Sequence, residues 1–68
     1  MEYMKYIVIE IQRSDTVGIL TYSYDTEMQA LARYYTILAA AASSNLPSHT
    51  AMIVTEDGMI VRSECIKH

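Results

Sequence analysis

The sequence predicts one α+β domain of ββαββ order, in which a four-stranded, mainly antiparallel sheet carries one helix on one face. Two pairs of runs rich in β-branched and aromatic residues predict the sheet, because each pair is joined by a short polar turn. The segment between the pairs has apolar residues at three- and four-residue spacing, which predicts a helix. A length of 68 residues allows a single domain, residues 1–68, with a small core.

The first hairpin is predicted from strands at Tyr3–Gln12 and about Val17–Tyr24, joined by the polar turn 13–16. We expect one face of the first strand to form the core stripe, through Ile7, Ile9 and Ile11. The opposite face is apolar at its start and polar at its end, which indicates partial cover. Gly18 in the second strand marks a bulge, a close backbone approach or simply a weak position.

The helix is predicted to begin after Thr26, which with Gln29 can form a capping box. Strong helix formers carry it to about Ser44. We expect Asn45 to close the helix in the left-handed conformation, with Leu46 making the hydrophobic contact that follows such a cap.

The second hairpin is predicted from strands at Thr50–Thr55 and Met59–Ile66. Its turn is Glu56-Asp57-Gly58, with the glycine in the left-handed position. Both faces of the first of these strands are apolar.

The helix carries two apolar stripes, and a four-stranded sheet covers only one side of a helix. We expect the sheet to bury Tyr34, Ile37, Leu38 and Ala41, although the opposite assignment of the two stripes fits the same pattern. The exposed stripe predicts a homo-oligomer, a dimer or higher, with an interface at Met28, Leu31, Tyr35, Leu38 and Ala42. The alternative is a strongly curled sheet that wraps the helix.

Composition excludes several classes of protein. The net charge is −3 and the five basic residues are scattered, which argues against nucleic-acid binding. No apolar run is long enough to span a membrane, and Glu2 stands where a signal peptide carries positive charge. The single cysteine, Cys65, fits a reducing cytoplasm, and with His68 it resembles only half of a zinc site. We therefore expect no metal and no cofactor.

The sequence lacks the clusters that catalysis needs, so we expect no enzyme. Glu10, Glu64 and Asp25 are interpreted as solvated carboxylates. Binding remains: arginines can grip an anion and tyrosines can stack on a planar group. The predicted ligand-binding residues are Arg33, Arg62, Tyr22 and Tyr24. The alternative is that the arginines are solvated or pair with Glu27 and Glu64.

Several short segments resemble small uncharacterised ββαββ proteins that phages and prophages of gut Firmicutes encode. The segments are Tyr24-Asp25-Thr26, the run Ile37–Ala42, Ser48-His49, Glu56-Asp57-Gly58 and Ser63-Glu64. The resemblance implies a phage accessory protein in the host cytoplasm or in the virion. We expect it to bind and sequester a host defence component, either an immune protein or an anionic, nucleotide-like immune signal. The alternatives are a minor virion structural or assembly protein and a small protein-binding regulator.

Overall fold

The computed structural model describes residues 4–68, in the order β1 (Tyr6–Arg13), β2 (Val17–Tyr24), α1 (Glu27–Ala42), β3 (Ser48–Thr55) and β4 (Ile60–Lys67). The predicted α+β fold of ββαββ order is confirmed. Strand lengths and the helix length match, since eight residues of strand span about 26 Å and the 16 residues of α1 span about 24 Å. The predicted first strand began at Tyr3, which lies outside the described residues.

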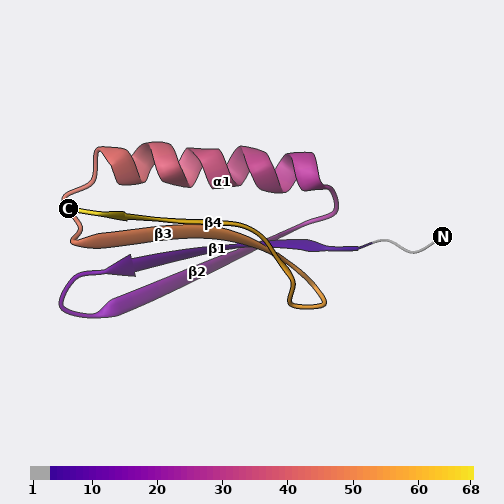
Figure 1. Cartoon of the computed structure of the whole chain (residues 1–68), viewed down its shortest axis with the longest axis horizontal. Coiled ribbons are helices and arrows are strands. Elements are labelled where there is room, and N and C mark those ends of the chain that lie inside the picture. Colours follow the sequence, from indigo (N-terminus) through magenta and orange to yellow (C-terminus); the bar gives the residue numbers. More distant parts are fainter. Residues whose placement is uncertain (1–3) are drawn as a thin grey trace.

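All four strands belong to one open sheet of order β2-β1-β3-β4, and every neighbouring pair is antiparallel. α1 carries the chain back along the sheet, so β3 can pair with β1 in the opposite direction (Figure 1). This return makes β1 and β3 the central strands and leaves β2 and β4 as the two edges. α1 lies along one face only, and no described helix has the length and apolar character needed to cross a membrane.

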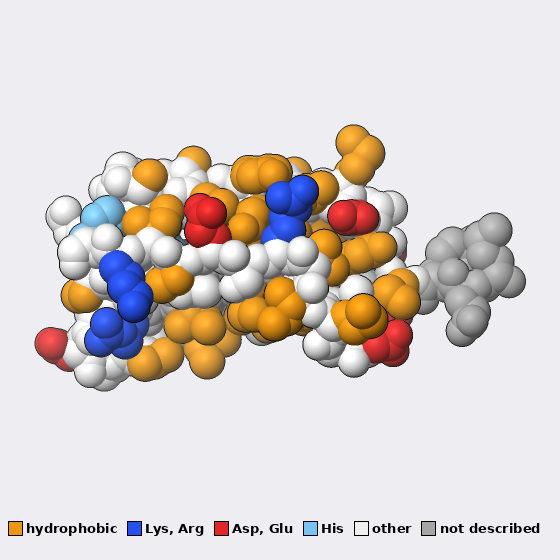
Figure 2. Space-filling view, in the orientation of Figure 1, with side chains coloured by type: hydrophobic (Ala, Val, Ile, Leu, Met, Phe, Trp, Pro, Cys, Tyr) orange, Lys and Arg blue, Asp and Glu red, His pale blue; other side chains and the backbone are white. Residues whose placement is uncertain are grey.

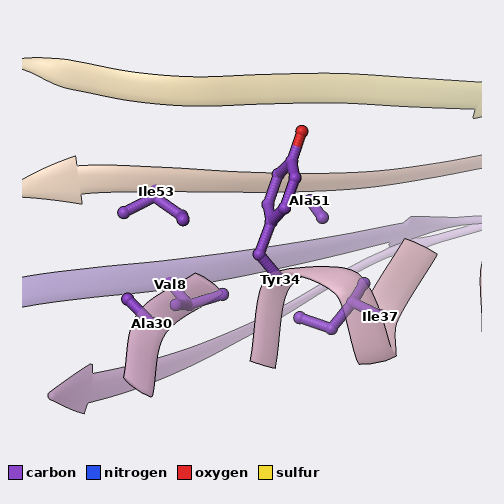
Figure 3. Packing of buried hydrophobic residues seen from close by; sticks show 6 residues of the cluster. All are labelled: Val8, Ala30, Tyr34, Ile37, Ala51 and Ile53. Atoms are coloured by element: carbon purple, nitrogen blue, oxygen red, sulfur yellow. The ribbon is translucent and has the colours of Figure 1, made fainter. Parts of the chain in front are cut away.

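The core lies between α1 and the two central strands. Its buried members are Val8, Ala30, Tyr34, Ile37, Ala51 and Ile53 (Figure 3). Tyr34 is the largest of them, and its ring lies across β3 with the hydroxyl pointing toward β4. The predicted cover of the helix stripe by the sheet is confirmed for Tyr34, Ile37 and Ala41, while Leu38 is half-buried.

The predicted core stripe of β1 is wrong. Val8 faces α1 and has no exposed surface. Ile7, Ile9 and Ile11 point to the opposite side of the sheet, because side chains alternate along a strand, and they are only half-buried. Both faces of β1 are apolar at its start, so the hydrophobic pattern alone did not identify the face that the helix covers.

The predicted start of α1 is confirmed, its end falls two residues before the expected Ser44, and the predicted left-handed cap at Asn45 is wrong. Thr26 is the N-cap, with extended backbone, and its Oγ1 accepts a hydrogen bond from the N–H of Gln29 at 3.2 Å. The helix ends at a Ser43 cap whose N–H donates to the carbonyls of Ala40 and Ala41. Among residues 4–68 only Gly58 has a positive φ, so Asn45 does not adopt the left-handed conformation.

The two glycines have different roles. Gly58 has φ of 90° in the β3–β4 turn, as predicted. Gly18 pairs regularly with Gln12 and marks no bulge. The one register shift in the described pairings lies between Ile53 and Val54, and it places Ile60 beside Val54.

The sheet face opposite α1, which we term the outer face, is largely apolar. The register places seven large hydrophobic side chains on it: Ile7, Ile9, Ile11, Val17, Ile19, Met52 and Val54. Ile60 joins them through the register shift, and 62% of it is exposed. Figure 2 shows hydrophobic side chains along the lower side of the molecule, away from α1.

Candidate functional site

A depression of about 400 Å³ lies beside α1, next to the β2 edge of the sheet. We term it the Arg33 groove, and it is lined by Tyr24, Gln29, Ala32, Arg33 and Thr36. Four of these residues come from α1, where three- and four-residue spacing places them on one side of the helix. Its volume is within the range of small-molecule sites, and its walls supply hydroxyl, amide and guanidinium groups.

Two tyrosines of β2 hold the guanidinium of Arg33. Its Nε donates a hydrogen bond to the Tyr24 hydroxyl at 2.9 Å, and its Cζ lies 4.4 Å from the centre of the Tyr22 ring. Tyr22 and Tyr24 are two residues apart in one strand and therefore point to the same face. The two contacts fix the plane of the guanidinium, and its terminal nitrogens, which make no hydrogen bond within residues 4–68, remain donors.

Arg33 has no ion-pair partner within residues 4–68, although the Glu10 carboxylate behind Tyr22 acts on its charge from a greater distance. The expected alternative of a pair with Glu27 is therefore not formed. The hydrogen bond to Tyr24 raises the pKa of Arg33 above its ordinary value, so the residue keeps its charge at every physiological pH.

A second, buried polar cluster lies behind Tyr22 and is centred on Glu10 of β1. Its Oε2 lies 2.7 Å from His49 Nε2 and accepts a hydrogen bond from Gln12 Nε2 at 2.9 Å. Its Oε1 accepts a longer bond of 3.5 Å from the Tyr22 hydroxyl. The interpretation of Glu10 as a solvated carboxylate is wrong, because only 8% of the residue is exposed.

Burial acts to raise the pKa of Glu10, but the hydrogen bonds from Gln12, His49 and Tyr22 outweigh it. The pKa therefore lies below its ordinary value, and the ionised carboxylate is the form that the fold favours. The ionised carboxylate also orients Tyr22 through its hydroxyl, so Glu10 supports the ring on which Arg33 rests.

His49 is only 3% exposed, and its Nδ1 has no hydrogen-bond partner among residues 4–68. The neutral tautomer with the proton on Nε2 donates to Glu10 and leaves a bare lone pair on Nδ1. The sequence contained one indication of this cluster, because Glu10 and Gln12 form the polar end of an otherwise apolar face of the first strand. It did not indicate that β3 pairs with β1 in the register that places His49 beside Gln12.

The structure brings three of the four predicted ligand-binding residues together. Arg33, Tyr22 and Tyr24 share the groove region, whereas Arg62 lies on β4 at the opposite edge of the sheet. The predicted stacking surface is changed too, because Arg33 already covers one face of the Tyr22 ring. A planar ligand in the groove would stack on the guanidinium instead.

The predicted oligomer interface on α1 is partly exposed. Met28 is 81% exposed and Tyr35 is also exposed, while Leu31 and Leu38 pack partly against the core.

At the C-terminus, the His68 ring lies 2.9 Å from the carbonyl of Ala41 and the Cys65 thiol lies 3.3 Å from the Ser48 hydroxyl. Within the described residues, no group of three or more His, Cys, Asp or Glu side chains is placed to hold a metal ion.

Comparison with known proteins gives no relative: no family model, no curated protein and no solved structure matches the chain.

Proposed function

We propose that this chain is a non-enzymatic, homo-oligomeric binding protein that sequesters an anionic, nucleotide-like ligand in the Arg33 groove. The observation that carries the proposal is the guanidinium of Arg33, which is fixed by two tyrosines, has no carboxylate partner within residues 4–68 and borders a depression of suitable size.

The groove offers the two kinds of contact that a nucleotide needs. The terminal nitrogens of Arg33 form a planar fork that matches a phosphate, and the Tyr24 hydroxyl keeps its own proton to donate because it accepts from Arg33. The open face of the guanidinium is a stacking surface for a base, since Tyr22 supports its other face. The Gln29 amide on the groove wall can donate to or accept from a base edge.

The buried cluster supports a binding role over catalysis. A His–Glu pair is a common element of acid–base catalysis, but such a pair must reach the substrate. Here Glu10 and His49 are both buried, and the hydroxyl that contacts Glu10 belongs to Tyr22, which supports Arg33. Their geometry suits the positioning of Arg33 better than proton transfer to a ligand.

The resemblance to phage and prophage proteins supplies the proposed setting. In the cytoplasm of an infected host, the ligand would be an immune signal nucleotide, and a stoichiometric binder would lower its free concentration. A protein that binds its ligand without turnover must be present in amounts similar to those of the ligand. A chain of 68 residues can be made in such amounts at low cost to the cell.

Thermal unfolding with added nucleotides tests the proposal. We expect cyclic dinucleotides or ADP-ribose-type nucleotides at 100 times their Kd to stabilise the fold by about 2.7 kcal/mol. Arg33→Gln should abolish this stabilisation. The matched control is Arg62→Gln, which removes the same charge at the opposite edge of the sheet and should leave binding unchanged. No shift with any nucleotide, or equal losses in both variants, would contradict the proposal.

The apolar outer face favours a second candidate, a structural or assembly component of the virion, because such proteins use large apolar contacts. Mass spectrometry of purified particles decides between the two. A virion component is present at a constant copy number per particle, whereas an intracellular binder is absent from particles and abundant in infected cells.

A further inference from the structure

The outer face is an apolar surface that α1 leaves without cover. Helix α1 packs on the other side of the sheet, so nothing within residues 4–68 lies over Ile7, Ile9 and Ile11. The edges of this face are still more exposed, with 61% of Ile19 and 62% of Ile60 accessible. Contiguous apolar patches of several hundred Å² on a protein mark an interaction site.

We propose that the outer face binds the outer face of a second copy, in a dimer whose two sheets stack with α1 on the outside of each. This proposal identifies the surface for the homo-oligomeric part of the proposed function and does not depend on the ligand. Two observations select a second copy as the occupant: the size of the face and the distribution of charge around it.

The size of the face meets the need of a stable dimer. Four eight-residue strands cover about 26 Å by 19 Å, or roughly 500 Å² on each copy and about 1,000 Å² on two. Specific interfaces bury at least about 1,000 Å² in total. Two sheets that meet in this way keep their strands roughly aligned and interdigitate their side chains, as the halves of a β-sandwich do.

Charges of opposite sign lie at the two ends of the face. At the end of β1 the register places Arg13 and Lys67 on the outer side, and Asp15 in the adjoining turn offsets one of these charges.

At the other end the β3–β4 turn, with Glu56 and Asp57, bends toward the outer side (Figure 1). Lys5 lies beside this turn, where its backbone N–H donates to Glu56 and its Nζ pairs with Asp25, so the end keeps an acidic excess. Figure 2 shows two basic side chains and one acidic side chain at one end of the lower side, and an acidic side chain at the other end.

This distribution selects one of the two ways in which a twofold axis can stack the sheets. An axis along the strands places Arg13 and Lys67 of both copies together, which is repulsive. An axis across the strands places them over the acidic turn of the other copy, which is attractive. We therefore assign the second arrangement, in which β2 lies over β2 of the partner and the strands of the two copies run in opposite directions.

The arrangement has a consequence for ligand binding. The Arg33 groove lies on the helix side of the sheet, so the dimer carries two separate grooves that face away from each other. The ligand site is not shared between the copies. Each dimer should bind two ligands independently.

Sedimentation equilibrium of the whole chain, without nucleotide, tests the interface. We expect a dimer, with Ile19→Asp raising its Kd more than about tenfold because the substitution buries two unpaired carboxylates. Ile19 lies on an edge strand and is exposed in the single chain, so the fold should survive, as circular dichroism will show. The matched control is Met28→Asp on α1, which should leave the Kd unchanged. A monomeric wild type, or a dimer that only Met28→Asp dissociates, overturns the proposal.

A charge exchange tests the direction of stacking. Arg13→Glu should raise the dimer Kd by about threefold, as expected for exposed charge pairs, and adding Asp57→Arg should restore it. If Arg13→Glu instead tightens the dimer, the strands of the two copies do not run in opposite directions and the assigned arrangement is wrong.

Cys65 provides a readout that needs no substitution. It lies on the outer face of β4 opposite Thr50, and it is exposed in the single chain. Alkylation by iodoacetamide should slow as the protein concentration passes the dimer Kd, and Ile19→Asp should remove this dependence. An alkylation rate that does not change with concentration in a dimeric wild type overturns the proposed interface. None of these measurements involves nucleotide, so a failure here is distinct from a failure of the ligand proposal.

Discussion

The Nε2 atom of His49 lies 2.7 Å from Oε2 of Glu10, and both residues are buried on the helix-facing side of the sheet. This contact joins the two central strands. Glu10 also accepts a hydrogen bond from the Tyr22 hydroxyl, and the ring of Tyr22 supports Arg33. A buried carboxylate is tolerated here because several donors surround it, and removal of either member leaves a polar group without its partner.

We predict that Glu10 makes stability dependent on acid pH. The pKa of Glu10 is lower in the folded chain than its ordinary value of 4.5, so the ionised form stabilises the fold. This contribution is complete above the ordinary value and is lost as the pH falls through the lower, folded pKa. Urea unfolding between pH 7 and pH 3 should show a weaker loss of stability in Glu10→Gln than in the wild type. Equal pH dependence would contradict the role of Glu10.

We predict that the same substitution has different effects on the two sides of the sheet. Ile53→Ala empties a fully buried core position and should cost about 2–5 kcal/mol of unfolding free energy. Ile9→Ala, on the outer face, should cost much less when the chain is monomeric. Both should be compared in the Ile19→Asp background, so that self-association does not contribute. An equal cost would mean that Ile9 is as well covered as Ile53, and a larger cost at Ile9 would mean that the helix covers the other face.

The two glycines should respond in opposite ways to alanine. Gly58 has φ of 90°, a conformation that costs an alanine about 1–2 kcal/mol. Gly18 has an ordinary φ, and the nearest atom to an added Cβ is 3.9 Å away, so Gly18→Ala should be neutral or stabilise by up to about 1 kcal/mol. Thermal unfolding of the two variants measures the difference. Destabilisation by Gly18→Ala would indicate a close backbone approach that the structure does not contain.

We predict that Arg33→Lys does not replace arginine in the groove. Lysine keeps the charge but lacks the planar fork that hydrogen-bonds Tyr24 and stacks on Tyr22. Titration calorimetry should show nucleotide binding at least about tenfold weaker, as for the loss of one charge-assisted bond. Full binding by the lysine variant would mean that the site recognises charge alone.

Local signals in the sequence determined the elements of this fold. A short segment of sequence is enough to predict the Thr26 cap, the left-handed Gly58 and the paired β-rich runs, because each depends on neighbouring residues. The sequence also predicted Arg33, Arg62, Tyr22 and Tyr24 as residues for an anionic, planar ligand, and that ligand remains a proposal. The sequence prediction failed at the end of α1, where Ser43 rather than Asn45 caps the helix through bonds to the carbonyls of the preceding turn.

Only the tertiary structure decided which faces meet. Apolar residues occupy both faces of β1 and β3, so either face is a reasonable core from the pattern alone. The choice depends on how α1 and the two hairpins assemble, and it places Val8 in the core and Ile9 on the outer face. The same assembly buries Glu10 beside His49, although the two residues are 39 positions apart, and sends Arg62 to the edge opposite Arg33. Contacts between distant segments depend on strand order and register, and no local spacing encodes these directly.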